Sequence, residues 1–282
     1  MTLGEILLIK NRTFLALYWL FAISGCTVTT AYNYLDWYVA WQVDDFVELT
    51  REQEATLEQE IKRIHDWHRK SELKKYIVLI ESINLAIKKS DPSIIPTKIE
   101  DIRQIWRQST IYVTPSIIVM LQTLTSEQKK ELLSNIERLQ QEHKDEWLEL
   151  EEQGFERKRK MRLDRLEDYL GSLDNGQEQL FYQLSDQLIN TTQLRIDSRR
   201  SWLSKFKRAL MVNGELDDSA ITPLFTDFTS YRSDEHQQAI EHNRLLYISF
   251  LQELVRTLSA KQKKHVERKL SEVVDTLEDL NS

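Results

Sequence analysis

The sequence is poor in the residues that break or cross-link a chain. Its 282 residues include one cysteine, four prolines and six glycines. A single cysteine excludes a disulfide within the chain and a zinc site built from several thiolates. Proline and glycine are the strongest helix breakers, so their scarcity leaves long stretches free to form helices. Leu, Glu, Gln, Lys and Arg are abundant, and no segment alternates apolar and polar residues over a convincing strand length. The composition therefore predicts an all-α fold.

Positive charge is also in short supply. Lys and Arg number 38 against 45 Asp and Glu, which gives a formal net charge of −7. Such a chain has no general attraction for nucleic acid, and we expect no nucleic-acid partner. The one basic run, at residues 157–160, has acidic residues on both sides. This pattern is typical of a solvated helix face with i,i+4 ion pairs.

The only cysteine, Cys26, follows a short apolar run. Lys10 and Arg12 precede the apolar residues 14–22, and small residues lead up to the cysteine as Ile23-Ser24-Gly25-Cys26. A basic start, a short apolar stretch and a small-residue cut site are the parts of a secretory signal. With the cysteine just after the cut site, the segment resembles the bacterial lipobox. The resemblance implies removal of residues 1–25, a diacylglycerol on Cys26, and an acylated N-terminus.

Two other interpretations of this segment are a transmembrane anchor and an ordinary buried cysteine. The apolar run covers about ten residues, whereas a helix needs roughly 20 to cross the hydrocarbon. Two or three acyl chains would anchor the protein stably to a membrane. Neither Thr27 nor Val28 is aspartate, the residue that resembles an inner-membrane retention signal. We therefore expect anchoring in the periplasmic leaflet of the outer membrane. Removal of the presequence, which carries a net +1, takes the charge from −7 to −8.

The mature chain is expected to form a tether over 26–33 and one helical domain over 34–282. Apolar residues at steps of three and four predict an elongated bundle of about seven helices. Their expected ranges are 34–47, from Arg51 to Asp91, 98–122, from after Thr125 to Leu170, 175–211, 223–257, and a last helix over the C-terminal residues. Pro115 is expected to kink or split the third helix. Gly154 interrupts the pattern of the fourth, and Gly171 is a plausible C-terminal cap.

A short pattern recurs four times, each time at an expected helix start. It consists of leucine, a short oxygen-bearing residue, two free positions and glutamine. The copies are Leu49, Thr50 and Gln53; Leu124, Thr125 and Gln128; Leu173, Asp174 and Gln177; and Leu258, Ser259 and Gln262. Thr, Ser or Asp as N-cap with Gln at N3 is a capping box. The N4 positions are charged, so the leucines cannot form hydrophobic staples and must pack elsewhere.

The repeat also resembles the LTxxQ motif of Spy-type periplasmic chaperones and CpxP-type envelope stress regulators. Those proteins are small and all-helical and bind unfolded clients on a cradle-shaped surface. The resemblance covers five residues at a time. It implies a chaperone-like activity, whereas the simpler interpretation is that each motif only starts a helix.

A second resemblance covers the chain from the lipobox to the C-terminus. It rests on residues 32–37, Asp44-Asp45, Trp67-His68-Arg69 and the segment from Arg165 to Gly171. These are similar to an uncharacterised Gram-negative lipoprotein family that carries only a domain-of-unknown-function label. The resemblance implies a lipid anchor and a helical fold, and no activity or catalytic residue.

Histidines are the main candidates for chemistry. His65 and His68 lie at i and i+3, so both could reach one metal ion, and His143 and His242 are the candidates for further ligands. His68 also continues an apolar stripe. A partly buried, hydrogen-bonded histidine is a simpler interpretation of this position than a metal ligand. The sequence lacks the HExxH spacing that joins two ligands to a general base. We therefore expect no metal, no cofactor and no enzymatic activity.

The sequence analysis leads to a function in protein binding. The aromatic residues Trp37, Tyr38 and Trp41 could line a client groove, although core packing is the more usual role of such a group. The favoured function is a non-enzymatic envelope lipoprotein that binds protein clients or partners as a chaperone, adaptor or stress-response component. The alternatives are a structural lipoprotein docked in a fixed envelope complex and, less favoured, an enzyme.

Overall fold

The computed structural model describes residues 32–210 and 216–281, and this part of the chain contains helices and loops but no strand. The all-α prediction is confirmed. The helices in chain order are α4 (Leu35–Asp44), α5 (Arg51–Trp67), α6 (Leu73–Lys89), α7 (Ile95–Thr123), α8 (Ser126–Glu152), α9 (Phe155–Leu170), α10 (Asn175–Gln187), α11 (Thr192–Leu210), α12 (Asp218–Thr226), α13 (Asp234–Thr257) and α14 (Ala260–Asn281). Cys26 and the signal-like segment before it lie outside the described residues.

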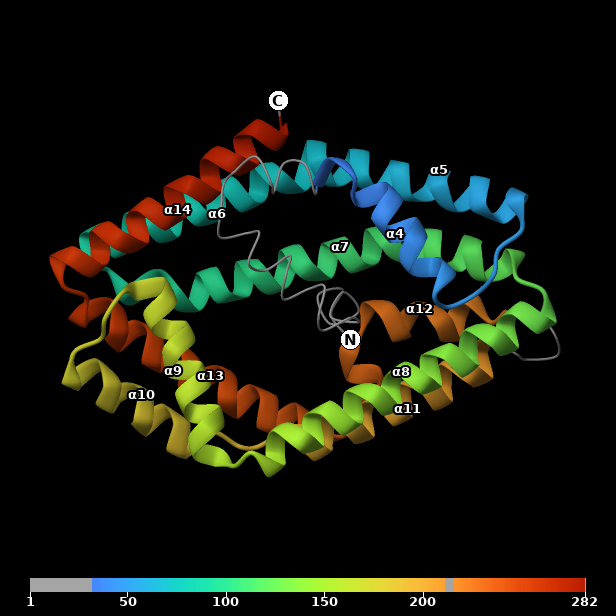
Figure 1. The fold of residues 1–282 in the computed structure, drawn as a ribbon. Helices are drawn as coiled ribbons and strands as arrows, with labels where there is room; N and C mark the ends of the chain where they lie inside the picture. The colour runs from blue at the N-terminus through green and yellow to red at the C-terminus, as the bar shows by residue number, and fades with distance from the viewer. Residues whose placement is uncertain (1–31, 211–215, 282) are drawn as a thin grey trace.

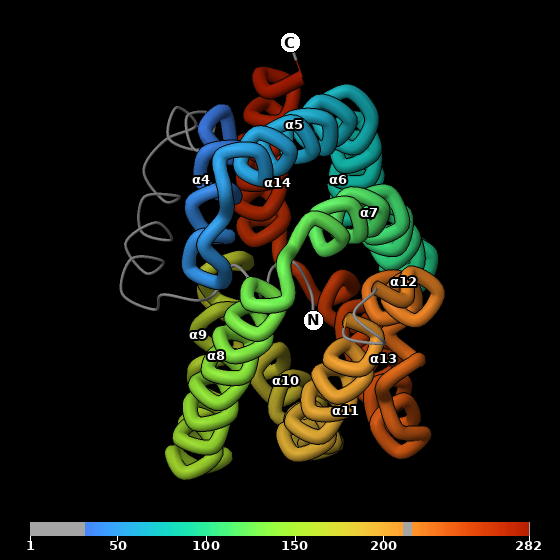
Figure 2. The backbone as a smooth tube through the Cα atoms, turned by 90° about the vertical axis from the view of Figure 1, so that its right-hand side faces the viewer, coloured from blue at the N-terminus to red at the C-terminus, as the bar shows by residue number. Residues whose placement is uncertain are grey.

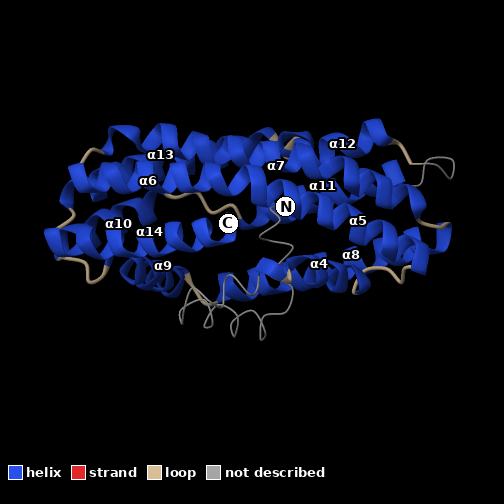
Figure 3. Ribbon diagram, turned by 90° about the horizontal axis from the view of Figure 1, so that it is seen from above, coloured by secondary structure: helices blue, strands red, loops and turns tan. Residues whose placement is uncertain are grey.

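The long helices run mostly along one axis, which makes the molecule elongated (Figures 1 and 3). Helix α14 packs along α6, α10 packs on α13, and α12 packs on both α7 and α11. Helix α4 packs on α5 and lies at one edge of the molecule when it is viewed along the axis, on the side away from α12 and α13 (Figure 2).

The apolar core consists of two clusters, each built from helix ends. The first joins the C-terminal parts of α7 and α11 to α8 and α12, with Trp202, Phe206 and Leu210 among its most buried members. The second joins the ends of α6 and α13 to the starts of α7 and α14, with Phe181 and Leu254 inside it. We call each cluster with the helices around it a lobe. Because α7 contributes to both clusters, it connects the two lobes.

The helix count of about seven is wrong, because the described chain divides three expected helices further: the fourth is broken at Gly154 into α8 and α9, and the fifth and sixth are divided as follows. The helix expected over 175–211 is two helices, α10 and α11. Asn190 caps the second one through Oδ1, which accepts from Thr192 N at 2.9 Å, and Asn243 bonds both backbone groups of Ile189. The helix expected over 223–257 is α12, a 3-10 turn η3 (Phe228–Tyr231) and α13. Ser233 caps α13 by accepting from His236 N.

Pro115 does not split α7, which is helical from Ile95 to Thr123. Three hydroxyls on the preceding turns donate to backbone carbonyls of the same helix. Thr114 donates to Thr110 O at 2.6 Å, Thr110 to Arg107 O, and Ser109 to Ile105 O. The helix therefore continues across a residue that lacks an N–H, with these side-chain bonds on the turns before it.

Between α5 and α6 the chain does not leave the helix but widens into a π-helical turn, η1 (His68–Glu72). The N–H of Leu73 donates to His68 O, five residues back. Gly154 and Gly171 occupy the breaks after α8 and α9 with φ of 84° and 81°, a backbone region that favours glycine. Within the described ranges, no helix has the length and apolarity that a membrane crossing requires.

Candidate functional site

The first two copies of the repeated motif meet through their glutamines. Gln53 Nε2 donates to Gln128 Oε1 at 2.9 Å, and Gln128 Nε2 donates to Gln53 Oε1 at 2.8 Å. The second N–H of each amide reaches the carbonyl directly before the other motif: Gln53 bonds Thr123 O, and Gln128 bonds Glu48 O. We call this arrangement clasp A.

The third and fourth copies meet in the same way, and we call this arrangement clasp B. Gln177 Nε2 donates to Gln262 Oε1 at 3.1 Å, and Gln262 Nε2 donates to Gln177 Oε1 at 2.8 Å. The second N–H bonds go to Thr257 O and Ser172 O, which again directly precede the partner motif. Gln177 is fully buried. The two clasps lie at opposite ends of the molecule, near the α7–α8 and α13–α14 connections (Figure 1).

Each glutamine also completes a capping box at its own helix. Thr50, Thr125, Asp174 and Ser259 accept from the N–H of the motif glutamine, and each donates its backbone N–H to that glutamine's Oε1. Each Oε1 atom therefore accepts at least two bonds while Nε2 donates two, which uses the full capacity of a primary amide; Oε1 of Gln262 also accepts from the hydroxyl of Ser259. Glutamate lacks the donors, so the clasp requires glutamine.

The motif leucines pack into the two core clusters. Leu124 and Leu258 are buried, and Leu49 and Leu173 pack against the first and second cluster respectively. The motif thus does two things at once. Its polar residues fix the helix start and join it to a distant loop, while its leucine joins the same segment to the core.

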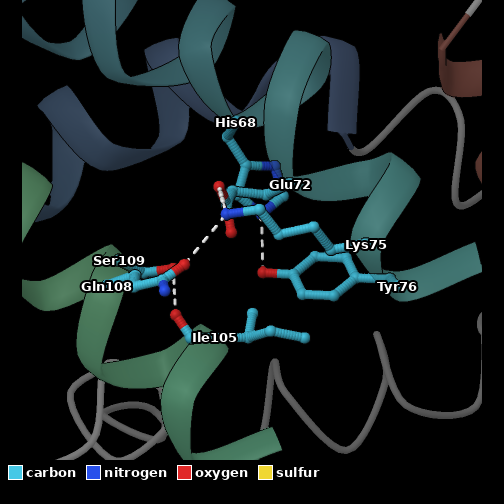
Figure 4. A network of polar contacts seen from close by, with 7 residues as sticks. All are labelled: His68, Glu72, Lys75, Tyr76, Ile105, Gln108 and Ser109. Carbon is cyan, nitrogen blue, oxygen red and sulfur yellow. Dashed lines mark hydrogen bonds and ion pairs between the residues drawn. The ribbon is translucent and has the colours of Figure 1, made fainter. Parts of the chain in front are cut away.

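The π-helical turn contains the second polar arrangement, which includes both histidines of the metal hypothesis. Nδ1 of His68 lies 2.8 Å from the hydroxyl of Tyr32, and Nε2 lies 3.2 Å from that of Tyr76. Glu72 is fully buried, with one oxygen bonded to Lys75 Nζ at 2.7 Å and the other without a hydrogen-bond partner among the described residues. Lys75 Nζ also donates to Gln108 Oε1 on α7 at 3.1 Å (Figure 4).

These contacts suit a neutral imidazole, which has one donor and one acceptor for the two hydroxyls. Burial lowers the pKa of His68, against the opposing effect of Glu72. Burial also raises the pKa of Tyr32 to about 12, although Arg69 acts in the other direction. The network therefore joins Tyr32, at the start of the described chain, to η1 and α6 by hydrogen bonds between uncharged groups.

The four histidines named in the metal hypothesis do not gather at one site. His65 and His68 both contact Tyr32, with ring centroids 4.7 and 5.8 Å from it. His143 is buried on α8 beside Trp147, and His242 is exposed on α13 near Gln187. Within the ranges that the structure describes, no three His, Cys, Asp or Glu side chains are grouped so that they could hold a metal ion.

A cleft of about 370 Å³ lies between the end of α8, α9, the α10–α11 connection and α13. Four apolar side chains on its lining are exposed, and they come from four different elements: Leu150, Phe155, Ile189 and Tyr247. Single exposed apolar residues are ordinary on a protein surface, but a group of them around one cleft is typical of a binding site. Ser185 also lines the cleft, and its buried Oγ has no hydrogen-bond partner within the described chain.

One wall of the cleft is cationic. It carries Lys158, Arg162 and Arg195, with Glu151 among them. Burial raises the pKa of Glu151, but hydrogen bonds from Lys158, Thr192 and Asn190 outweigh that effect and hold the pKa below its ordinary value. Glu151 thus stays ionised and neutralises Lys158 at 2.6 Å. The two arginines then give the cleft a positive character in a chain that is acidic overall.

The sequence analysis did not find this cleft. Leu150 belongs to an apolar stripe of the fourth expected helix, Phe155 follows the break at Gly154, Ile189 lies in an unexpected loop at 188–191, and Tyr247 lies within α13. No single sequence pattern joins these four residues. The sequence analysis also expected Trp37 and Trp41 to be core residues, and this is wrong: their side chains are 65% and 41% exposed. Tyr38 is half-buried.

The fold and its two clasps define an all-helical protein with two lobes, each closed by a pair of motifs. The chain belongs to a family of unknown function, DUF6279, whose sequence model matches residues 45–237, more than half of its length. The matched segment includes clasp A and the third motif. No curated protein and no solved structure matches the chain.

Proposed function

We propose that this chain is a non-enzymatic lipoprotein of the bacterial outer membrane, anchored through Cys26, that binds segments of other proteins in the α8–α13 cleft. The family is one of unknown function and supplies no activity. The proposal follows from the lipobox-like segment of the sequence together with the composition of the cleft.

The observation that carries the binding function is the grouping of exposed apolar side chains with a cationic wall. An unfolded or extended segment offers apolar side chains and, in most sequences, carboxylates. Leu150, Phe155 and Ile189 would receive the apolar groups, and the guanidinium of Arg195, which stands 5.0 Å from the centroid of Trp147, would face the acidic ones. Such a surface favours many clients with modest affinity over one specific partner.

The main alternative is a structural or assembly lipoprotein that docks in a fixed envelope complex. The rigid clasps favour this alternative, because a scaffold with two fixed ends suits a folded partner of fixed shape. Client breadth separates the two functions. A chaperone-like protein binds many unfolded chains, whereas an assembly protein binds one folded partner.

Suppression of client aggregation tests the proposal. Residues 27–282, which contain every described element, are mixed with a chemically unfolded model protein, and light scattering is followed as the client is diluted from denaturant. Phe155→Ser and Ile189→Ser are expected to reduce suppression several-fold, because both side chains are exposed at the cleft.

The matched controls replace exposed apolar residues on other elements, Val78→Ser on α6 and Val273→Ser on α14. We expect these controls to retain the activity of the unchanged chain. Equal suppression by cleft and control variants would show that the cleft is not the binding site. Absence of suppression by the unchanged chain, with capture of a single folded envelope protein instead, would favour the assembly function.

A further inference from the structure

Helix α4 presents aromatic side chains to the outside instead of to the core. None of its residues is buried. Tyr34 and Trp37 are 64% and 65% exposed, and Trp41 is 41% exposed. The rings of Trp37 and Trp41 are stacked, with centroids 6.4 Å apart and planes 8° from parallel. The spacing 34, 37, 41 places these three residues on one side of the helix, and we call them the α4 aromatic face.

The start of this helix is fixed to the domain. Tyr32 contacts His68 through its hydroxyl, and Arg69 donates to Asn33 Oδ1 at 2.6 Å. The guanidinium of Arg69 also lies 5.3 Å from the centroid of the Tyr32 ring. Tyr32 and Asn33 belong to the segment that the sequence analysis assigned to the tether. The number of residues between Cys26 and the first residue that contacts the domain is therefore smaller than that analysis implies.

The short tether limits the distance between α4 and an anchor at Cys26. Six residue steps separate Cys26 from Tyr32. A fully extended chain spans at most about 3.3–3.6 Å per residue, so this segment reaches about 20–22 Å. Acyl chains on Cys26 would thus keep Tyr32, and the start of α4 beside it, within that distance of the anchor.

We propose that the α4 aromatic face inserts into the headgroup layer of the membrane that holds Cys26. This inference rests on the lipid anchor of the proposed function. Trp and Tyr favour the membrane–water interface, because their rings are apolar at one end and polar at the other. Insertion would be a second membrane contact, which fixes the orientation of the domain instead of leaving it free on its tether.

The charges on and around this face determine which lipid surface it suits. Asp36 and Asp44 on α4 are exposed, and the chain as a whole is acidic. Anionic lipids would repel these groups, so a zwitterionic surface is the expected one. Affinity would come from buried apolar area and not from charge attraction.

The first test measures binding of the unlipidated chain, residues 27–282, to phosphatidylcholine vesicles by co-sedimentation. We expect the unchanged chain to bind, and Trp37→Ser/Trp41→Ser to lower the partition coefficient on the order of tenfold, because partition scales with buried apolar area. Vesicles rich in phosphatidylglycerol should bind less. Val78→Ser, at an exposed site on α6, is the matched control and should bind as the unchanged chain does. If the double variant melts early, Trp37→Ser alone replaces it.

The second test uses the lipidated full chain in vesicles that contain brominated lipids. We expect quenching of tryptophan fluorescence, and we expect Trp37→Phe/Trp41→Phe to remove the quenched component while Trp147→Phe at the cleft retains it. Equal vesicle binding by the unchanged chain and the Ser variants, or quenching that persists in Trp37→Phe/Trp41→Phe, would overturn the proposal. So would a dimer that forms only when Trp37 and Trp41 are present and does not bind vesicles.

Failure of the anchor is a separate outcome. The mass of the N-terminal peptide reports directly whether Cys26 carries acyl chains. An unmodified Cys26 with vesicle binding that depends on Trp37 would reject the lipid anchor and retain the aromatic face. A lipidated Cys26 without quenching would do the reverse.

Discussion

Gln177 and Gln262, 85 residues apart, each donate a side-chain N–H to the other's carbonyl oxygen and a second N–H to the backbone before the other's motif. Gln53 and Gln128 repeat this relationship across 75 residues at the other end of the molecule. Each clasp thus closes a long segment of chain with side-chain and backbone bonds. Gln177 and Gln262 of clasp B are both buried, whereas in clasp A Gln53 is buried and Gln128 is partly exposed. Closure of this kind fixes where distant helix starts meet.

Loss of a clasp glutamine should destabilise the fold. Gln177→Ala removes the bonds to Gln262 and to Thr257 O, and it leaves buried polar groups unpaired at about 1–3 kcal/mol each. Urea unfolding should show this loss, whereas Gln183→Ala on the exposed side of α10 should change the free energy of unfolding little. The double variant Gln177→Ala/Gln262→Ala should cost less than the sum of the single ones, because the two side chains bond each other. Strict additivity would mean that the pair does not act as a unit.

The capping residues of the four motifs should contribute separately from the clasps. Thr50→Ala, Thr125→Ala, Asp174→Ala and Ser259→Ala are each expected to lower the free energy of unfolding by about 0.5–2 kcal/mol, the usual effect of a lost N-cap. Thr56→Ala is a matched control, because Thr56 lies inside α5 and its hydroxyl donates to Glu52 O of the same helix. Melting of all four cap variants at the temperature of this control would reject the capping role.

The sequence could predict these features because they depend on local pattern. A capping box needs four consecutive residues, and Gln at N3 after Thr, Asp or Ser identifies one. The pairing of motifs was not predictable, since no local signal states which of the four meets which. The π turn at His68–Glu72 and the division of α10 from α11 also escaped prediction. Both depend on tertiary contacts, from Tyr32 and Asn243 respectively, that pattern analysis does not contain.

Stability should fall as the medium becomes acidic, in part through His68. Because burial lowers the pKa of His68 below 6.5, the unfolded chain binds its proton first as pH decreases. The stabilisation is therefore fully present above about pH 6.5 and is lost as pH falls through the lower pKa of the folded state. His65 and His236 have pKa values lowered by burial as well, so they contribute in the same direction.

Thermal melts between pH 7.5 and 5 measure the His68 contribution. His68→Gln should be less stable than the unchanged chain at pH 7.5, because its contacts with Tyr32 and Tyr76 change, but its melting temperature should fall less steeply towards pH 5. His242→Gln, which removes an exposed imidazole on α13, controls for the loss of a histidine as such. If the melting temperature of His68→Gln fell as steeply with pH as that of the unchanged chain, the pKa of this imidazole would not differ between the folded and unfolded states.

Cys26→Ser should release the protein from the membrane. The expectation rests on the small residues before Cys26 and on the short apolar run behind a basic start, because a thioether-linked diacylglycerol requires the cysteine sulfur. Cell fractionation should move most of the variant from the membrane to the soluble envelope fraction, and the mature N-terminal peptide should lose the mass of its acyl chains. Thr27→Ser alters the neighbouring residue and should leave both readouts unchanged.

If the α4 aromatic face binds lipid, Cys26→Ser should keep a weak membrane association that salt does not remove. Adding Trp37→Ser and Trp41→Ser to Cys26→Ser, which makes a triple variant, should abolish it. Full membrane retention of the triple variant would show that something other than the lipid and this face holds the protein there.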